Sequence, residues 1–298
     1  MTSFAIEHFF DRATSTLSYL VFDPVSHDAV VIDPVLDFDP ASGHTSIAGV
    51  RTIADAIAAR GFTLHAVIET HAHADHLSGS QYLKRILGAA VMIGEGITEV
   101  QQSFKPVLGL ADDFATDGSQ FERLLRDGER LRFGALEMTV LATPGHTPAC
   151  SSYLFGDAVF TGDALFMEDS GTGRCDFPKG DAAALYHSVH DRLYALPDET
   201  RVFVGHDYQP NARPLAFETT IGRAKRGNVQ LQEETRLADF VKFRTERDRT
   251  LGAPRLLFPS VQVNVDAGRL PRADALGRRL LRTPLNMGSY TLDDGTPS

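Results

Sequence analysis

Hydrophobic residues recur with two different periods along the first two hundred residues of the chain. Short apolar runs typical of β-strands occupy residues 17–22, 29–33, 65–69, 90–94, 130–134, 136–143, 151–156, 158–162 and 201–205. Apolar positions three or four residues apart predict helices around Ile53 and Ile57, over 77–88 and over 180–196. The polar segment 34–45 is predicted to be a loop. Strands and helices that alternate in this way predict an α/β fold with helices packed outside sheets.

The pattern changes after about residue 210. Residues 228–248 contain no glycine or proline and are predicted to be helical. Leu237, Phe240 and Val241 share one face of this predicted helix. Residues 261–268 alternate like a strand, and the last ten residues resemble a loose tail. We therefore expect two parts, a catalytic domain over residues 1–210 and a C-terminal extension over residues 211–298 that packs on it.

Composition is that of a soluble globular protein. Of 298 residues, 43% are hydrophobic and 23% are charged, and the net charge is −10. The acidic balance argues against nucleic acid as a partner, because phosphate binding favours a basic face. Two cysteines, no recognisable secretory leader and no apolar run of about 20 residues predict a cytoplasmic protein without a membrane partner.

The stretch ETHAHADHLSGS, residues 69–80, concentrates metal-ligand residue types directly after a predicted strand. It contains His71, His73, Asp75 and His76. Side chains two positions apart on an extended chain point the same way, so His71 and His73 can serve one metal. Asp75 and His76 point elsewhere and can serve another. Histidine and carboxylate ligands suit iron, zinc and manganese.

Three later turns repeat this arrangement of a short apolar strand followed by a ligand-type residue. They carry His146 in TPGHT, Asp163 in FTGDALF and His206 in VFVGHDY. Loops at strand ends are where a rigid scaffold places chemistry. The repeated arrangement therefore predicts one metal site assembled from distant segments.

In this order and at these separations, HAHADH, PGH, TGDALF and GHDY resemble the metallo-β-lactamase fold. The resemblance covers about residues 5–210 and implies an αββα sandwich of two mixed β-sheets flanked by helices. It also implies a first metal site of His71, His73 and His146. A second site would use Asp75, His76 and His206, with Asp163 able to bridge.

Within that superfamily the sequence is similar to two branches. The persulfide dioxygenase branch keeps one Fe(II), and its two histidines and one aspartate match His71, His146 and Asp163. SGTGRCDF at 170–177, Ala74 before Asp75, and GHDY resemble that branch. The resemblance implies oxidation of glutathione persulfide, or a similar small persulfide, with O₂ to sulfite. TSTLSY (14–19) and IDPVLDFD (32–39) match most closely a bacterial subgroup.

The roles of the remaining candidates follow from this interpretation. His73, Asp75, His76 and His206 would fix the ligands and bound water by hydrogen bonds, with Asp75 and His76 acting in catalysis. Tyr208 would hydrogen-bond near the open positions, or would be a buried aromatic with a satisfied hydroxyl. Arg174 would pair with a substrate carboxylate or form a structural salt bridge.

Two further features stay open in the sequence. Basic residues that could form a pocket for an anionic tripeptide, or a solvated helix face, are Arg213, Arg223, Lys225 and Arg226. Cys175 would be a thiol relay or, more simply, a buried spectator.

The main alternative is a glyoxalase II-like hydrolase with two zinc ions, which would cleave a thioester or another ester. In that enzyme all seven ligand-type residues would bind metal. A metal-stabilised binding module without turnover is a third interpretation, and a triad that leaves coordination positions open argues against it. We expect a small persulfide and O₂ as partners, and a homodimer is possible.

Overall fold

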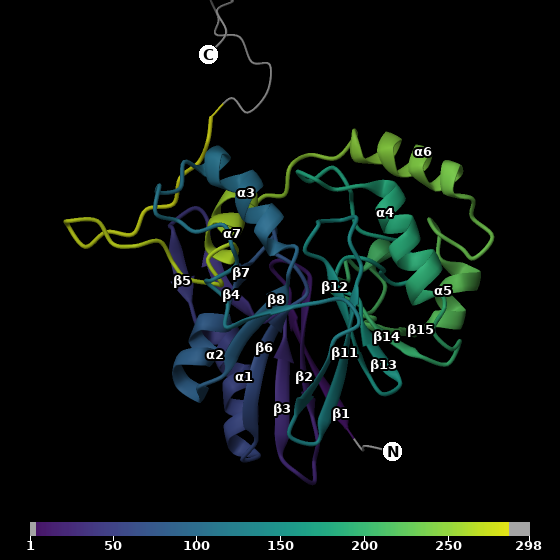
Figure 1. The fold of residues 1–298 in the computed structure, drawn as a ribbon, viewed down its shortest axis with the longest axis horizontal. Helices are drawn as coiled ribbons and strands as arrows, with labels where there is room; N and C mark the ends of the chain where they lie inside the picture. The colour runs from purple at the N-terminus through teal and green to yellow at the C-terminus, as the bar shows by residue number, and fades with distance from the viewer. Residues whose placement is uncertain (1–3, 286–298) are drawn as a thin grey trace, which may run out of the picture.

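The computed structural model describes residues 4–285. Figure 1 shows two β-sheets packed face to face in the middle of the molecule, with helices outside both. This is the α/β architecture predicted from the sequence, the αββα sandwich. The C-terminal extension lies against the same end of the sandwich as the loops that follow several strands.

The first sheet has the strand order β1-β2-β3-β6-β8-β9. Its strands are β1 (Ala5–Asp11), β2 (Thr16–Phe22), β3 (Asp28–Ile32), β6 (Thr63–Glu69), β8 (Ala90–Gly94) and β9 (Arg123–Leu125). Strands β1, β2 and β3 pair antiparallel, whereas β3, β6, β8 and β9 run parallel. The carboxyl ends of the parallel strands therefore lie at one edge of the sheet.

The second sheet has the order β10-β11-β12-β13-β14-β15. Its strands are β10 (Arg130–Phe133), β11 (Leu136–Ala142), β12 (Ser151–Phe155), β13 (Ala158–Phe160), β14 (Arg201–Phe203) and β15 (Glu218–Thr220). Only β13 and β14 pair in parallel. Strand β15 completes this sheet, although it comes after residue 210.

Helices cover the outer faces of the sandwich. They are α1 (Ala48–Ala59), α2 (Ser80–Leu87), α3 (Ile97–Leu108), α4 (Ala182–His187), α5 (Ile221–Gly227), α6 (Leu237–Asp248) and α7 (Leu257–Asn264). In Figure 1, α1 and α2 lie beside the first sheet, whereas α4, α5 and α6 lie beside the second. Asp181 is the N-cap residue of α4, and its carboxylate accepts hydrogen bonds from the Ala183 and Ala184 amides. It continues into a π-helical segment, Ser188–Leu193.

The alternation of side chains along the strands explains this layering. In β3, Val30 and Ile32 are buried in the core between the sheets, whereas Ala29 and Val31 are buried beneath α1 and α2. Both faces of the strand are thus covered, and its sequence is a continuous apolar run. Aromatic side chains from the second sheet, among them Tyr153 and Phe160, fill the space between the sheets.

Several predicted elements need correction. Residues 261–268, predicted as a strand, include the second half of α7. This helix is buried on nearly all sides and so shows no polar face to reveal its helical period. Residues 34–45, predicted as a loop, contain β4 (Val35–Asp39) and β5 (His44–Ser46), which form a small sheet with β7 (Leu77–Ser78). That sheet is partly exposed, so its strands contain polar residues.

Two predicted helices begin later in the structure than the sequence pattern indicated. The helix predicted over 228–248 begins only at Leu237, because the Asn228 side chain accepts hydrogen bonds from the Gln230 and Leu231 amides and holds a turn. The helix predicted over 77–88 begins at Ser80. Strands β1, β9 and β15 and helices α3 and α5 were not predicted. The last ten residues lie outside the described residues.

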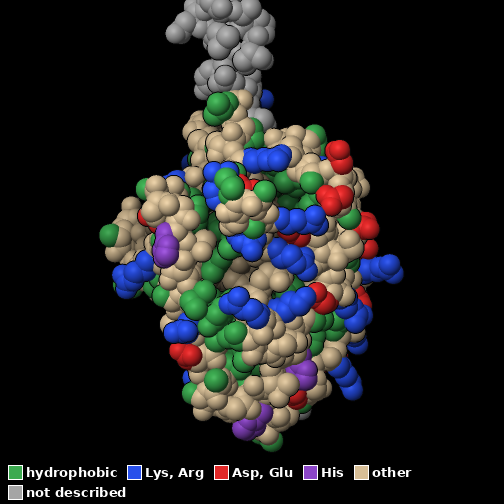
Figure 2. All heavy atoms as spheres, turned by 90° about the vertical axis from the view of Figure 1, so that its left-hand side faces the viewer, with side chains coloured by type: hydrophobic (Ala, Val, Ile, Leu, Met, Phe, Trp, Pro, Cys, Tyr) green, Lys and Arg blue, Asp and Glu red, His purple; other side chains and the backbone are tan. Residues whose placement is uncertain are grey.

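Basic side chains gather on one face of this acidic protein. Figure 2 shows Lys and Arg side chains across the face that carries α2 and the C-terminal segment. Part of this face lines a hollow with Lys84, Arg85, Arg269, Arg272, Arg278, Arg279 and Arg282. Several of these side chains pair with acidic neighbours, as Arg272 does with Asp113 at 3.1 Å. Among residues 4–285, no helix is long and apolar enough to cross a membrane.

Asp28 connects the two sheets. Its carboxylate accepts a hydrogen bond from the Ala135 amide, in the turn between β10 and β11, at 2.8 Å. It also lies 2.6 Å from the Nε2 atom of His65 on β6. Hydrogen bonds from Ser26, His65 and Ala135 lower the pKa of Asp28 to about 2.

Asp28→Asn should lower the free energy of unfolding by about 1 kcal/mol at pH 7, because the variant loses charge-assisted hydrogen bonds. A lowered folded-state pKa gives stability that is complete above the unfolded-state pKa and disappears as the pH falls through about 2. Urea unfolding of metal-free protein at pH 7 and pH 3 should therefore show a smaller difference from wild type at pH 3. The exposed Asp55→Asn control should match wild type at both pH values, and an equal deficit for Asp28→Asn at both would contradict the account.

Candidate metal centre

Four loops at one end of the sandwich carry the predicted ligands. They follow β6, β11, β13 and β14, and they bring together His71, His73, Asp75, His76, His146, Asp163 and His206. All five histidines and Asp163 are less than one-tenth exposed. Residues separated by more than 130 positions in the sequence thus meet because their strands end at the same edge.

His71, His146 and Asp163 form the most compact group. Their ligand atoms lie within 4.8 Å of one another. The Asp163 Oδ2 atom is 3.6 Å from Nε2 of His146 and 4.0 Å from Nε2 of His71. Two imidazoles and one carboxylate that converge in this way match the facial arrangement used for non-haem iron.

His73, Asp75 and His76 form a second group within the same distance limit. His206 joins it, because its Nε2 atom lies 3.5 Å from Oδ2 of Asp75 and 3.3 Å from Oδ1 of Asp163. His73 also belongs to a third group, together with Asp33 and Glu69. Its Nε2 atom lies 3.0 Å from Oδ1 of Asp33. This contact does not have hydrogen-bond geometry, because Nε2 of His73 has no hydrogen-bond partner.

Buried ring nitrogens without hydrogen-bond partners show that these residues fit a metal. These nitrogens are Nε2 of His71, His76 and His206 and both ring nitrogens of His73. The Oδ1 atom of Asp163 is also buried without a hydrogen-bond partner. An unpaired buried polar atom costs about 1–3 kcal/mol, so several in one cluster need a common partner. A divalent cation held by the histidines and Asp163 supplies one.

Hydrogen bonds on the far side of two rings set their orientation. Nδ1 of His146 donates to the backbone carbonyl of Arg174 at 2.6 Å, which leaves the Nε2 lone pair directed at Asp163. Nδ1 of His71 lies 3.0 Å from the hydroxyl of Thr70, which donates to Asp33 at 2.7 Å. Asp33 has a φ of +49°, a left-handed conformation that is unfavourable for most side chains.

Burial also controls the protonation of the site. It lowers the pKa of His71 and of His73 well below the ordinary histidine value, so both rings are neutral and can donate a lone pair. Burial raises the pKa of Asp75, but the electrostatic effect of His206 and His76 is larger in sum. The pKa of Asp75 therefore lies well below its usual value. His71 and His73 are therefore neutral imidazoles beside the ionised Asp75. His206 differs, because burial lowers its pKa but Asp163 and Asp75 outweigh burial and raise it.

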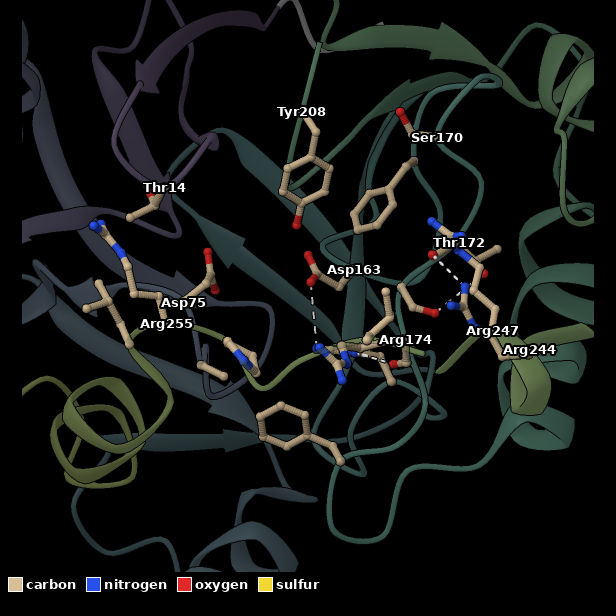
Figure 3. A pocket seen from close by; sticks show the side chains of 18 of the residues that line it. Thr14, Asp75, Asp163, Ser170, Thr172, Arg174, Tyr208, Arg244, Arg247 and Arg255 are labelled. Atoms are coloured by element: carbon tan, nitrogen blue, oxygen red, sulfur yellow. Dashed lines mark hydrogen bonds and ion pairs between the residues drawn. The ribbon is translucent and has the colours of Figure 1, made fainter. Parts of the chain in front are cut away.

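A cavity of about 440 Å³ opens onto the compact group (Figure 3). Asp75, His146 and Asp163 reach its wall, together with apolar Phe166, Phe177, Leu251 and Leu256. Its size falls within the range of small-molecule sites. Figure 3 shows the Tyr208 hydroxyl directed toward Asp163. The cavity therefore combines an apolar lining with access to the candidate metal.

Three predicted residues have defined places in this cavity or beside it. Tyr208 is 57% exposed, so it is not the buried aromatic weighed as one interpretation, and its ring stacks on His206 with centroids 5.6 Å apart. The Arg174 side chain lines the cavity but is held by Asp176 at 2.5 and 2.6 Å. Cys175 is buried, and burial raises the pKa of its thiol, which indicates an inert spectator.

The four basic residues suggested as an anion pocket lie elsewhere. Arg213 binds Asp169 and Asp207, whereas Arg223 pairs with Glu168. Lys225 and Arg226 both pair with Asp198. The cavity is instead lined by Arg174, Arg244, Arg247 and Arg255. Arg174 was a candidate from the sequence, whereas no sequence pattern favoured Arg244, Arg247 or Arg255, because the place of α6 and of the segment after it in the fold could not be predicted.

Sequence reasoning also missed Asn264, a buried residue in α7. Its side-chain amide donates hydrogen bonds to the backbone carbonyls of His73 and His76, both at 2.8 Å. Its oxygen accepts from the Ser78 amide at 2.9 Å. One side chain of the C-terminal extension thus holds both ends of the loop that carries Asp75.

Asp248 in α6 supports the opposite side of the site. Its carboxylate pairs with Arg244 and accepts a hydrogen bond from the Cys175 amide at 2.8 Å. Arg244 also donates to the Thr172 carbonyl at 3.3 Å. These contacts fix the loop whose Arg174 carbonyl orients His146.

Asn264→Asp should weaken metal binding at least tenfold, because a carboxylate cannot donate to the His73 and His76 carbonyls. The substitution preserves side-chain size, so the variant should remain folded. Metal content measured after equilibration with a competing chelator tests the expectation.

Ser260→Ala is the matched control. Ser260 is also buried in α7, and its hydroxyl has no hydrogen-bond partner, so its loss should leave metal content unchanged. Equal metal retention by Asn264→Asp and wild type would show that the loop does not need this contact.

Comparison with known proteins agrees with the fold. The family model described as metallo-beta-lactamase superfamily matches residues 11–206. The structure of ETHE1 from Myxococcus xanthus is similar with a TM-score of 0.71 and 33% identity, covering 89% of this chain and all of that one.

Relatives with similar sequences carry different functional names. A probable metallo-hydrolase from Burkholderia pseudomallei is 46% identical, covering 94% of this chain and 99% of its own. Glyoxylase B2 from Dictyostelium discoideum is 42% identical over 94% and 97% of the two chains. The persulfide dioxygenase ETHE1 of Homo sapiens is 33% identical over 68% of each. With its fold, its matched segment and its histidine–aspartate metal-binding site, the chain belongs to the metallo-β-lactamase superfamily.

Proposed function

We propose that the protein is a mononuclear non-haem iron dioxygenase that oxidises glutathione persulfide, or a similar small persulfide, with O₂ to sulfite. The observation that carries the proposal is the group of His71, His146 and Asp163, of which His146 and Asp163 line the cavity. Two imidazoles and one carboxylate on one side of Fe(II) leave positions open for substrate and oxygen. The similarity to the two ETHE1 proteins supports the same activity.

The proposed reaction balances without a further reductant. One persulfide, one O₂ and one water give one thiol and one sulfite; the sulfur–sulfur bond breaks, the outer sulfur loses four electrons and O₂ gains them. Iron held by the triad would supply oxygen activation when bound. The chain's own residues then bind the persulfide, orient its outer sulfur toward Asp163, and limit access of water.

Residues around the triad provide these functions. Phe166 and Phe177 give the cavity apolar walls that favour a sulfur chain over water. Tyr208 presents a hydroxyl donor near Asp163 (Figure 3). Asp75, ionised and facing the cavity, can accept a hydrogen bond from the bound persulfide or water.

The remaining predicted residues act through others. His76 lies with its Nδ1 atom 3.3 Å from Asp75 and so positions that carboxylate. Arg174 contributes its carbonyl to His146. Because Asp176 occupies its guanidinium, a structural role for the Arg174 side chain is the simpler assignment.

A dinuclear zinc thioester hydrolase is the second candidate. The second ligand group, His73, Asp75 and His76, and the proximity of His206 favour it, as do the hydrolase and glyoxylase names of two relatives. Two zinc ions would supply Lewis acidity and an activated water for hydrolysis. The two candidates share every ligand residue and differ in metal count and in the use of O₂.

Protein purified without oxygen should consume one O₂ per glutathione persulfide and release one sulfite, because the sulfane sulfur needs four electrons removed. Oxygen-electrode and sulfite measurements check this, beside an S-lactoylglutathione hydrolysis assay. Hydrolysis without oxygen uptake would contradict the dioxygenase and support the zinc enzyme.

His206→Ala should retain about one iron per chain if the metal is held by the triad alone. Asp163→Asn should lose it, because the triad loses its anionic ligand. Elemental analysis of both variants provides the measurement, with the exposed His187→Ala as control. Loss of one of two metal equivalents in His206→Ala would indicate a dinuclear site.

A further inference from the structure

Two arginines of the C-terminal extension line the cavity without an acidic partner. Arg247 lies in the last turn of α6, and Arg255 lies shortly before α7. Both are exposed, and within residues 4–285 neither forms an ion pair with Asp or Glu. The other two cavity arginines differ, because Arg174 is paired with Asp176 and Arg244 with Asp248. Only the first two guanidinium groups are therefore available to a ligand.

The positions of these arginines suggest an elongated ligand. Figure 3 shows Arg255 beside Thr14 and Asp75 on one side of the cavity, and Arg247 beyond Thr172 on the other. Asp163 lies between them. In this view, the path from one arginine to the other passes across Asp163.

We propose that Arg247 and Arg255 each bind one carboxylate of a substrate whose reacting sulfur lies between two carboxylates. This rests on the proposed persulfide oxidation at the same site. Glutathione has this layout, with the γ-glutamyl α-carboxylate at one end, the glycine carboxylate at the other and the cysteine sulfur between them. A cavity of about 440 Å³ is of the size that takes a small molecule of this kind.

The charge balance of the protein supports the assignment. The chain carries a net charge of −10, and Asp75 and Asp163 add negative charge at the cavity wall. The two carboxylates of the substrate would be repelled unless local cations compensated. Guanidinium groups match carboxylates with two parallel hydrogen bonds, so unpaired arginines at both ends provide the compensation and the orientation.

Binding of S-methylglutathione to the metal-loaded protein, measured by isothermal titration calorimetry, tests the inference without turnover. Arg247→Gln and Arg255→Gln should each raise the dissociation constant roughly tenfold, the effect of one partly exposed charge-assisted contact. Arg249→Gln is the matched control, because Arg249 directly follows α6, is exposed and does not line the cavity. It should bind like wild type.

Two modified ligands assign the ends. The glycine amide of S-methylglutathione lacks the glycine carboxylate, and N-acetyl-S-methyl-cysteinylglycine lacks the γ-glutamyl carboxylate. One arginine substitution should lose its effect with the first ligand, and the other should lose its effect with the second. The inference is overturned if wild type does not bind S-methylglutathione, if the arginine variants bind like Arg249→Gln, or if their deficits are the same for all three ligands.

The same proteins separate this inference from the proposed function. Arginine-dependent binding without oxygen uptake would reject the dioxygenase and retain the carboxylate contacts. Oxygen uptake with glutathione persulfide whose KM is the same in wild type and both arginine variants would retain the dioxygenase and reject the contacts.

Discussion

The interaction on which the site depends is between a cation and imidazole nitrogens that have no other partner. Nε2 of His71 and of His206 and both ring nitrogens of His73 are buried without a hydrogen bond. Left unpaired, these atoms would destabilise the fold, and protonated histidines packed this closely would repel one another. A metal held by His71, His146 and Asp163 gives the His71 nitrogen a partner, whereas the nitrogens of His73 and His206 need bound water or a second metal. Metal affinity and the stability of this end of the sandwich are therefore linked.

This constraint explains why the C-terminal extension matters to chemistry that occurs in the sandwich. Loops that carry metal ligands need support on the side away from the metal. Asn264 supplies it for the loop around Asp75, and Asp248 supplies it for the loop that orients His146. The extension also contributes Arg247 and Arg255 to the cavity, so one segment shapes both the metal site and the substrate site.

The sequence was informative where short-range pattern decides structure. The apolar alternation of β3 and the ligand cluster after β6 were predictable, because strands buried on both faces and loops at their ends leave clear signals. Helix α7 was not, since valines at 261, 263 and 265 alternate like a strand while the helix is buried nearly all round. Asn264 could not be identified from sequence, because its role depends on contacts across about 190 positions.

The most direct test of the account is the number and place of metal ions in crystals of protein purified without oxygen. Anomalous diffraction at the iron edge should give one peak per chain, within bonding distance of His71, His146 and Asp163 at about 2.0–2.2 Å. Two peaks of comparable height, one of them among Asp75, His76 and His206, would contradict a mononuclear centre and support a dinuclear hydrolase.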